Sequence, residues 1–352
     1  MRRSRYLLKR SIGYLATIFL ILLFNFVLIR VMPGDPMLYI LGEEDYYDFY
    51  YNNPEYLEQL CQEYDLDGSI LHQFGLYWRN ILHLDFGTSY HYGRPVLDLI
   101  LFRASWTLRL VLPAVLLAAL LGVLLGLPAG WFSGRWGERL GTPVLTILHT
   151  IPTYCLSIIL LSIFAYRLGW LPLGGMVSGG KSGAAYVWDM LWHMTLPLIV
   201  LVLYRVSYDY LILRSSVREI REEPYITTAF STGLSQRVVL FRHVLPNAIL
   251  PYVTAVCLQF GAAVAGTMTM EVIYNWSGMG SLIYDAVNNR DFPVLQTAFL
   301  VIAVCTILAN LLADVLYAAI DPRLRREVPS RWNNVIWCWA APPLLPEWSC
   351  CC

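Results

Sequence analysis

The stretch GGMVSGGKSG, residues 174–183, carries residue types that could bind a nucleotide. It contains a full match to G-x-x-x-x-G-K-[ST], with Gly175 and Gly180 at the glycine positions, followed by Lys181 and Ser182. In nucleotide-binding domains the glycines let backbone N–H groups surround the phosphates, while the lysine contacts the terminal phosphates and the hydroxyl holds Mg²⁺. That chemistry also needs a buried strand before the pattern and a helix after it. The elements that flank this stretch therefore decide what it does.

Other patterns of catalytic or metal-binding residues are missing from the sequence. The six histidines and eight cysteines form no H-E-x-x-H or Cys-x-x-Cys pattern, and no G-x-S-x-G sequence supplies a nucleophile. The cysteines also show no disulfide framework. We therefore expect no catalytic residue, no metal site and no cofactor, and nothing indicates a nucleic-acid partner.

The composition indicates a membrane protein. Hydrophobic residues make up 57% of the chain and charged residues only 14%, which lies outside the range of soluble globular proteins. A helix of about 20 apolar residues spans the hydrocarbon core of a bilayer. Six stretches qualify, although the fourth carries two charged residues: Ser11–Ile29, Leu110–Gly134, Leu140–Tyr166, Met190–Leu213, His243–Met270 and Phe292–Ala313.

The distribution of basic residues predicts the orientation, because short cytoplasmic segments hold an excess of Lys and Arg. With both termini in the cytoplasm, the inner segments contain 16 basic residues, whereas the outer stretches 32–106, 167–189 and 271–291 contain six. The stretch 32–106, between the first two spans, adds 12 acidic residues to the outer side. We therefore expect both termini to be cytoplasmic and the first span to remain as an anchor.

This orientation places residues 174–183 outside the cell, between the third and fourth spans. ATP is absent there, and a membrane helix rather than a buried strand precedes the pattern. We therefore expect a flexible glycine-rich turn at this position, and not a nucleotide site.

The longest inner loop, residues 214–246, has the pattern of two short helices joined by a turn. Pro224 suits the first position of a helix that runs to Thr232, and Gly233 suits the left-handed residue that ends it. Ser235 can cap a second short helix that ends at Leu245-Pro246. Two interpretations follow: a rigid helix-turn-helix on which a partner protein acts, or an amphipathic loop that lies among anionic lipid headgroups.

Several separated motifs resemble one family, the permeases of ATP-binding-cassette (ABC) importers. Thr227, Thr228 and Ala229 occupy the E-A-A positions of that family's cytoplasmic signature, with Gly233 and Leu245-Pro246 at the expected spacing. The two threonines and His243 depart from the signature. The sequence resembles the peptide and nickel importer permeases more closely, and this similarity covers about residues 1–326. The stretches that carry it are YITTAFSTGL, RHVLPNAILPYVT, EVIYNWSGMGSL, RDFPVLQ and LLADVLYAAIDPRLR. RVMPGDP and LDFGTSYHYGRPVLDLI resemble the first, B-type, of the two permease subunits.

The resemblance implies an all-α polytopic protein with six transmembrane helices of the type I ABC importer fold, located in the inner membrane of a bacterium or archaeon. Such a permease is not itself an enzyme. It pairs with a homologous second permease, two cytoplasmic ATPases and an external solute-binding protein. The helix from Pro224 is then the coupling helix. The residues expected to couple to the ATPases are Glu223, Pro224, Tyr225, Thr228, Ala229, Gly233, Leu245 and Pro246.

The chain divides into four predicted parts. Residues 1–31 form the inner terminus and first span, and 32–106 form an outer subdomain that either caps the pore or docks the binding protein. Residues 107–326 form the five-helix permease core with the coupling loop 214–246. The Trp- and Cys-rich tail 327–352 departs from the family, and we expect it to be disordered.

Ionisable residues within the spans leave two interpretations open. We expect Arg205 and Asp209, which are four residues apart on one helix face, to pair with each other. His149 and His193 either contact a polar substrate or make structural hydrogen bonds.

Three classes of membrane protein differ in the residues that they require. A membrane enzyme requires a nucleophile or metal cluster, and a secondary transporter requires broken helices or repeats with acidic residues at the midplane. The motifs favour the importer permease. Its predicted substrates are peptides, or nickel and related small solutes, with glutathione or an oligosaccharide as the alternative.

Overall fold

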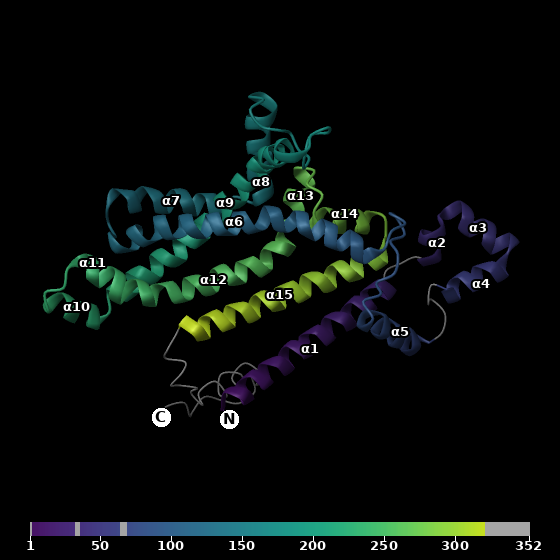
Figure 1. Ribbon diagram of the computed structural model, residues 1–352, viewed down its shortest axis with the longest axis horizontal. Coiled ribbons are helices and arrows are strands. Elements are labelled where there is room, and N and C mark those ends of the chain that lie inside the picture. The colour runs from purple at the N-terminus through teal and green to yellow at the C-terminus, as the bar shows by residue number, and fades with distance from the viewer. Residues whose placement is uncertain (1, 32–35, 64–68, 321–352) are drawn as a thin grey trace, which may run out of the picture.

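The computed structural model describes residues 2–31, 36–63 and 69–320 (Figure 1). Within these ranges all regular secondary structure is helical, apart from one isolated β-bridge between Thr88 and Pro95. The first helices are α1 (Arg2–Val31), α2 (Pro36–Leu41), α3 (Glu43–Asn52), α4 (Pro54–Glu63) and α5 (Ile70–Leu82). The helices that follow are α6 (Val96–Trp131), α7 (Trp136–Thr150), α8 (Thr153–Leu160), the π-helix η1 (Leu161–Arg167), α9 (Gly183–Arg221), α10 (Pro224–Ser231), α11 (Gln236–Val239), the π-helix η2 (Leu240–Val244), α12 (Leu245–Gly266), α13 (Met268–Ile273), α14 (Met279–Asn288) and α15 (Phe292–Ile320). The predicted tail 327–352 lies outside the described residues.

The long helices α1, α6, α12 and α15 run in a similar direction, with α10 and α11 at one end of the molecule and α2–α5 at the other (Figure 1). Among the described residues, four helical segments are long and apolar enough to cross a bilayer: 96–131, 183–221, 236–260 and 292–313. The bent pair formed by α7 and α8–η1 adds at most a fifth. The predicted first span corresponds to α1, whose apolar part Gly13–Val27 is shorter than the other spans.

The third predicted span, Leu140–Tyr166, is not continuous. α7 and the α8–η1 segment meet at an angle of 99°. The break falls at Ile151-Pro152, because proline has no backbone N–H and disfavours the helical conformation in the residue before it. Ile151 accordingly adopts extended backbone angles, with φ −71° and ψ 124°. The expectation of an unbroken helix here was therefore wrong.

Close packing of α6 on α9 holds the centre of the bundle together. Gly122, Gly126 and Gly130 follow one another at four-residue intervals on the face of α6 that meets α9. A Cβ atom at Gly130 would lie 2.7 Å from the carbonyl oxygen of Arg214, and one at Gly122 would lie 2.6 Å from the Cβ of Asp209. Small residues at this spacing let two membrane helices approach closely, which compensates for the weak hydrophobic driving force within lipid.

A buried carboxyl organises the other end of the bundle. Glu271 of α13 is fully buried and accepts hydrogen bonds from the Thr107 hydroxyl at 2.7 Å and from the Ser281 backbone N–H at 3.0 Å. A Cβ atom at Gly278 would lie 2.4 Å from this carboxyl. The sequence EVIYNWSGMGSL therefore acts as a packing unit that joins α13 and α14 to α6.

Candidate functional site

The helix-turn-helix predicted for residues 224–246 is present at one end of the bundle. Glu223 occupies the N-cap position of α10 with extended backbone angles, and Pro224 is the first helical residue. α10 ends at Ser231, one residue before the predicted end. Gly233 then has φ +84°, and its N–H donates to the Phe230 carbonyl at 3.0 Å. The turn thus has the left-handed glycine that the sequence predicted.

One face of α10 is anchored and the other is open. Ile226 is only 1% exposed and, with Ala229, packs against a cluster that includes Val217 and Val239. Of the predicted coupling residues, the majority are exposed, namely Glu223, Pro224, Tyr225, Thr228, Gly233 and Pro246, while Ala229 and Leu245 are partly buried. The segment 225–241 exposes several apolar side chains, namely Tyr225, Phe230, Leu234 and Phe241. Such a surface is typical of a protein-protein contact.

The second helix does not end at Leu245-Pro246 as predicted. α11 continues through η2 into α12, so residues 236–260 form one candidate span. The π-helical turn gives room for Pro246, whose ring would otherwise contact the preceding turn. The side chain of Ser235 makes no capping hydrogen bond. Asn247 supports the join, since its Nδ2 donates to the His243 carbonyl at 2.8 Å and to the Tyr225 hydroxyl at 3.3 Å.

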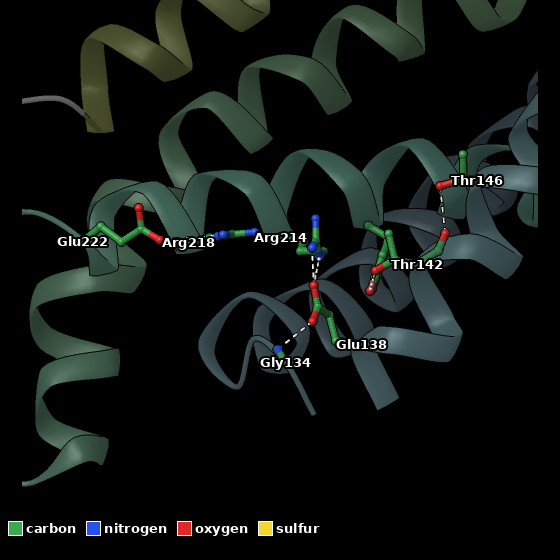
Figure 2. A network of polar contacts seen from close by, with 8 residues as sticks. Gly134, Glu138, Thr142, Thr146, Arg214, Arg218 and Glu222 are labelled. Carbon is green, nitrogen blue, oxygen red and sulfur yellow. Dashed lines mark hydrogen bonds and ion pairs between the residues drawn. The ribbon is translucent and has the colours of Figure 1, made fainter. Parts of the chain in front are cut away.

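An ion pair that the sequence did not predict joins α7 to α9 at the end of the molecule that carries α10. Figure 2 shows Glu138, at the start of α7, facing Arg214 on α9. The Arg214 Nε donates to Glu138 Oε1 at 2.9 Å, and the other carboxyl oxygen accepts from the Gly134 backbone N–H at 2.7 Å. Farther along α9, Arg221 Nη1 donates to the Trp131 carbonyl at 2.6 Å. These bonds join the last turns of α9, which lead into α10, to the ends of α6 and α7.

Nothing in the sequence distinguishes Glu138 from an ordinary surface acid. It stands in a short basic stretch, next to Arg139, yet it is only 9% exposed. By contrast, Arg218 and Glu222, which also appear in Figure 2, form an exposed i,i+4 pair with 3.4 Å between the Arg218 Nε and Glu222 Oε1. Exposed pairs of this kind contribute little to stability.

A cavity of about 510 Å³ lies beside α11. Aromatic side chains of Trp131, Phe132 and Phe241 line it together with Arg237. Among the residues that the structure describes, no three His, Cys, Asp or Glu side chains gather as a possible metal site.

The loop 174–183 is attached to α9 at several points. Lys181 forms an ion pair with Asp189, and the Ser178 backbone N–H donates to the same carboxylate. The Nδ1 of His193 lies 3.1 Å from the Gly174 carbonyl oxygen, and the Gly175 N–H donates to the Tyr274 carbonyl at 2.8 Å. The lysine of the nucleotide-like motif is thus engaged by a carboxylate, and His193 makes a structural contact. A turn held at these points differs from the free turn that the sequence suggested.

A second polar cluster joins the loop before α6 to α14 and α15. Asp291 accepts from the Ser89 hydroxyl and from the His91 N–H, and Tyr92 donates its hydroxyl to Asp285 at 3.1 Å. Burial and the neighbouring Asp285 carboxylate raise the pKa of Tyr92. This cluster fixes the sequence LDFGTSYHYGRPVLDLI to α14 and to the start of α15.

Arg205 and Asp209 do not form the direct pair that the sequence predicted. Gln259 of α12 lies between them: its Nε2 donates to Asp209 Oδ1 at 2.7 Å, and the Arg205 Nη1 lies 3.4 Å from the Gln259 carbonyl oxygen. The i,i+4 spacing brings the two side chains to one face, but contact with α12 determined their partners.

The fold and this end of the molecule define an all-α membrane permease. The family of binding-protein-dependent transport system inner membrane components matches residues 122–326. The glutathione transport system permease protein GsiC of Escherichia coli K12 is 34% identical over 320 residues, which cover 91% of this chain and 98% of the relative. GsiC of Shigella boydii serotype 4 is 33% identical over 321 residues, with the same coverage.

A solved structure of the MetNI methionine ABC transporter, in an inward-facing conformation, has a similar fold. Its TM-score is 0.50 at 15% sequence identity, and the match covers 64% of this chain and 97% of that one. The chain belongs to the family of binding-protein-dependent transport system inner membrane components, and it is a permease of an ABC importer.

Proposed function

We propose that this permease imports a short peptide, such as glutathione, with energy supplied by two separate cytoplasmic ATPases. A second, homologous permease completes the path, and an external binding protein delivers the solute. The name of the GsiC relatives supports a glutathione-like substrate over nickel or an oligosaccharide. The chain is the pore-forming half and carries no catalytic residue.

The observation that carries this proposal is the open face of α10. Tyr225 is 43% exposed, and Thr228, three residues later on the same face, is exposed as well, while Ile226 is buried. A partner that covers the open face and displaces α10 also moves the ends of α6 and α9, because Ile226 shares one packed cluster with Trp131 of α6 and Val217 of α9, and Arg221 at the end of α9 donates to the Trp131 carbonyl. Transmission through such a packed element is typical of domain-level switches. Coupling therefore depends on Glu223, Pro224, Tyr225, Thr228, Ala229, Gly233, Leu245 and Pro246.

The orientation is part of the proposal: α10 and both termini face the cytoplasm, and α2–α5 face outward. The excess of basic residues in segments at the α10 end supports it. Single-cysteine labelling tests it. Gly179→Cys and Gln236→Cys both lie at exposed positions, and a membrane-impermeant maleimide added to intact cells should modify only the first. Modification of only the second would reverse the orientation.

The function itself is tested by reconstitution. The two permeases and two ATPases are placed in proteoliposomes, and ATP-dependent uptake of radiolabelled glutathione is measured with and without the binding protein. Uptake that needs both ATP and the binding protein is the expected result. Uptake by this chain alone, or driven by an ion gradient without ATP, would contradict the proposal.

A further inference from the structure

A cation lies deep within the longest helix of the molecule. Arg205 is eight residues before Leu213, the end of the predicted fourth span, which corresponds to about 12 Å along the helix axis of α9. Asp209 lies one turn closer to that end and is only 2% exposed, whereas Arg205 is partly exposed. Ionisable groups at such a depth within a membrane span are costly, and they are commonly retained where they contact a substrate or a water-filled path.

The hydrogen bonds of Arg205 leave much of its donor capacity unused. Its Nη1 lies 3.4 Å and 3.5 Å from the carbonyl oxygen and Oε1 of Gln259, close to the upper limit for a hydrogen bond. Its Nε is buried and has no acceptor among the described residues. A guanidinium group has five N–H donors in a fixed fork. Gln259 meanwhile donates to Asp209 at 2.7 Å, so that carboxylate is already engaged.

An aromatic surface adjoins this arginine. Tyr204, the residue before Arg205, stacks on His149 with 5.3 Å between ring centroids, and Tyr208 lies 5.8 Å from the same imidazole. The His149 Nδ1 is buried and has no partner within the described chain. Tyr208 is 40% exposed. Arg205 and Tyr208 are three residues apart on α9 and are therefore neighbours on its surface, and Tyr208 also contacts His149 of α7.

The break between α7 and α8 lies next to this surface. His149 is one residue before the end of α7, and α8 begins at Thr153 after the bend at Pro152. Broken membrane helices next to unpaired polar groups are a recurring feature of substrate sites in transporters, because the start of the second segment offers unpaired N–H groups. The Arg205 guanidinium is a cation with an unpaired N–H donor, so the ligand that complements it is an anion.

We propose that Arg205, together with the surface of His149, Tyr204 and Tyr208, binds the carboxylate of the substrate as it crosses the membrane. A carboxylate fits because it accepts two parallel hydrogen bonds from a guanidinium fork. This inference rests on the proposed import of a short peptide, and it names the part of the substrate that the membrane path recognises.

The test compares variants in the reconstituted complex, with glutathione as the probe. Arg205→Gln should lower glutathione-stimulated ATP hydrolysis and uptake by about tenfold or more, as expected for loss of a charge-assisted hydrogen bond. The uptake and ATP hydrolysis of Arg205→Lys should lie between those of the wild type and Arg205→Gln, because an ammonium group keeps the charge but lacks the forked pair of N–H donors. Arg139→Gln removes an exposed arginine on α7 and should behave as the wild type. The same loaded binding protein is used throughout, so its own selectivity cancels.

A second probe separates substrate binding from a structural role. Glutathione diethyl ester has no free carboxylate, and it is supplied at a concentration that saturates the purified binding protein. A subsite for the carboxylate predicts that Arg205→Gln lowers stimulation by glutathione but not by the ester. An equal loss with both probes would overturn the inference. If Arg205→Gln does not assemble with the ATPases, His149→Gln is compared with the two probes in the same way.

The possible failures can be distinguished. A wild-type complex that glutathione does not stimulate would overturn the proposed substrate, and this inference with it. A wild-type complex that responds normally, with variants at Arg205 and His149 that respond equally well, would overturn the subsite alone.

Discussion

Gly233 offers a direct test of the coupling turn, because the free-energy cost of replacing it comes from one identifiable source. Its φ is +84°, and a Cβ atom added there would meet no atom within 4 Å. Gly233→Ala therefore introduces no steric clash with neighbours, and its whole cost is the left-handed backbone conformation. That cost is roughly 1–2 kcal/mol for a residue with a Cβ atom, which lowers the population of the native turn by a factor of about 5–30.

The expected result is a loss of coupling in a permease that still inserts. The apparent affinity for the ATPases should fall by up to about 5–30-fold, because they bind the native turn. Co-purification of the ATPases and substrate-stimulated ATP hydrolysis, each titrated with ATPase, measure this change. Membrane abundance of the permease should stay normal, since the spans do not depend on this turn.

Two matched variants make the result interpretable. Gly233→Asn should recover much of the function, because asparagine tolerates the left-handed region better than alanine. Gly137→Ala is the control, as this exposed glycine in α7 also has open space around it but no positive φ. Full coupling in Gly233→Ala, or equal losses in Gly233→Ala and Gly137→Ala, would refute the reasoning from backbone strain.

Three further predictions concern the supporting structure. Glu138→Ala should lower the melting temperature of the purified permease, since it leaves the partly buried Arg214 guanidinium without its carboxylate. The double variant with Arg214→Ala should lose less stability than the sum of the two single variants. Strict additivity would show that the pair does not interact. Gly130→Val should reduce the amount of folded permease, because its Cβ would lie 2.7 Å from the Arg214 carbonyl oxygen. Gly141→Ala is the control and should be tolerated, since the nearest atom to its Cβ is 3.8 Å away. The amount of monodisperse protein extracted in detergent measures folding, and a normal amount of Gly130→Val would contradict the packing of α6 on α9. Lys181→Ala should leave the ATPase rate of the complex unchanged, because this lysine is paired with Asp189, and loss of nucleotide binding in this variant would restore the phosphate-loop interpretation.

Local chemistry was sufficient to predict the coupling turn from the sequence. Pro224 at the first position of α10 and Gly233 at positive φ both follow from the conformational preferences of single residues. Long apolar stretches likewise located the membrane helices, because a bilayer demands a minimum length of apolar helix whatever its neighbours are. The division of the chain into four parts and the coupling roles of individual residues remain predictions.

Contacts between residues from distant parts of the chain were determined only by the folded protein. Proline signals were visible at both Pro152 and Pro246, yet the first broke a span by 99° and the second was absorbed in a π-helical turn. Glu138 resembled a surface acid until α9 brought Arg214 to it, 76 residues away. The helix start at Pro224 and the positive φ of Gly233 depend on a few neighbouring atoms, so the sequence determines them. An ionisable side chain takes its partner from whatever the packed helices place beside it, and only the tertiary structure determines that.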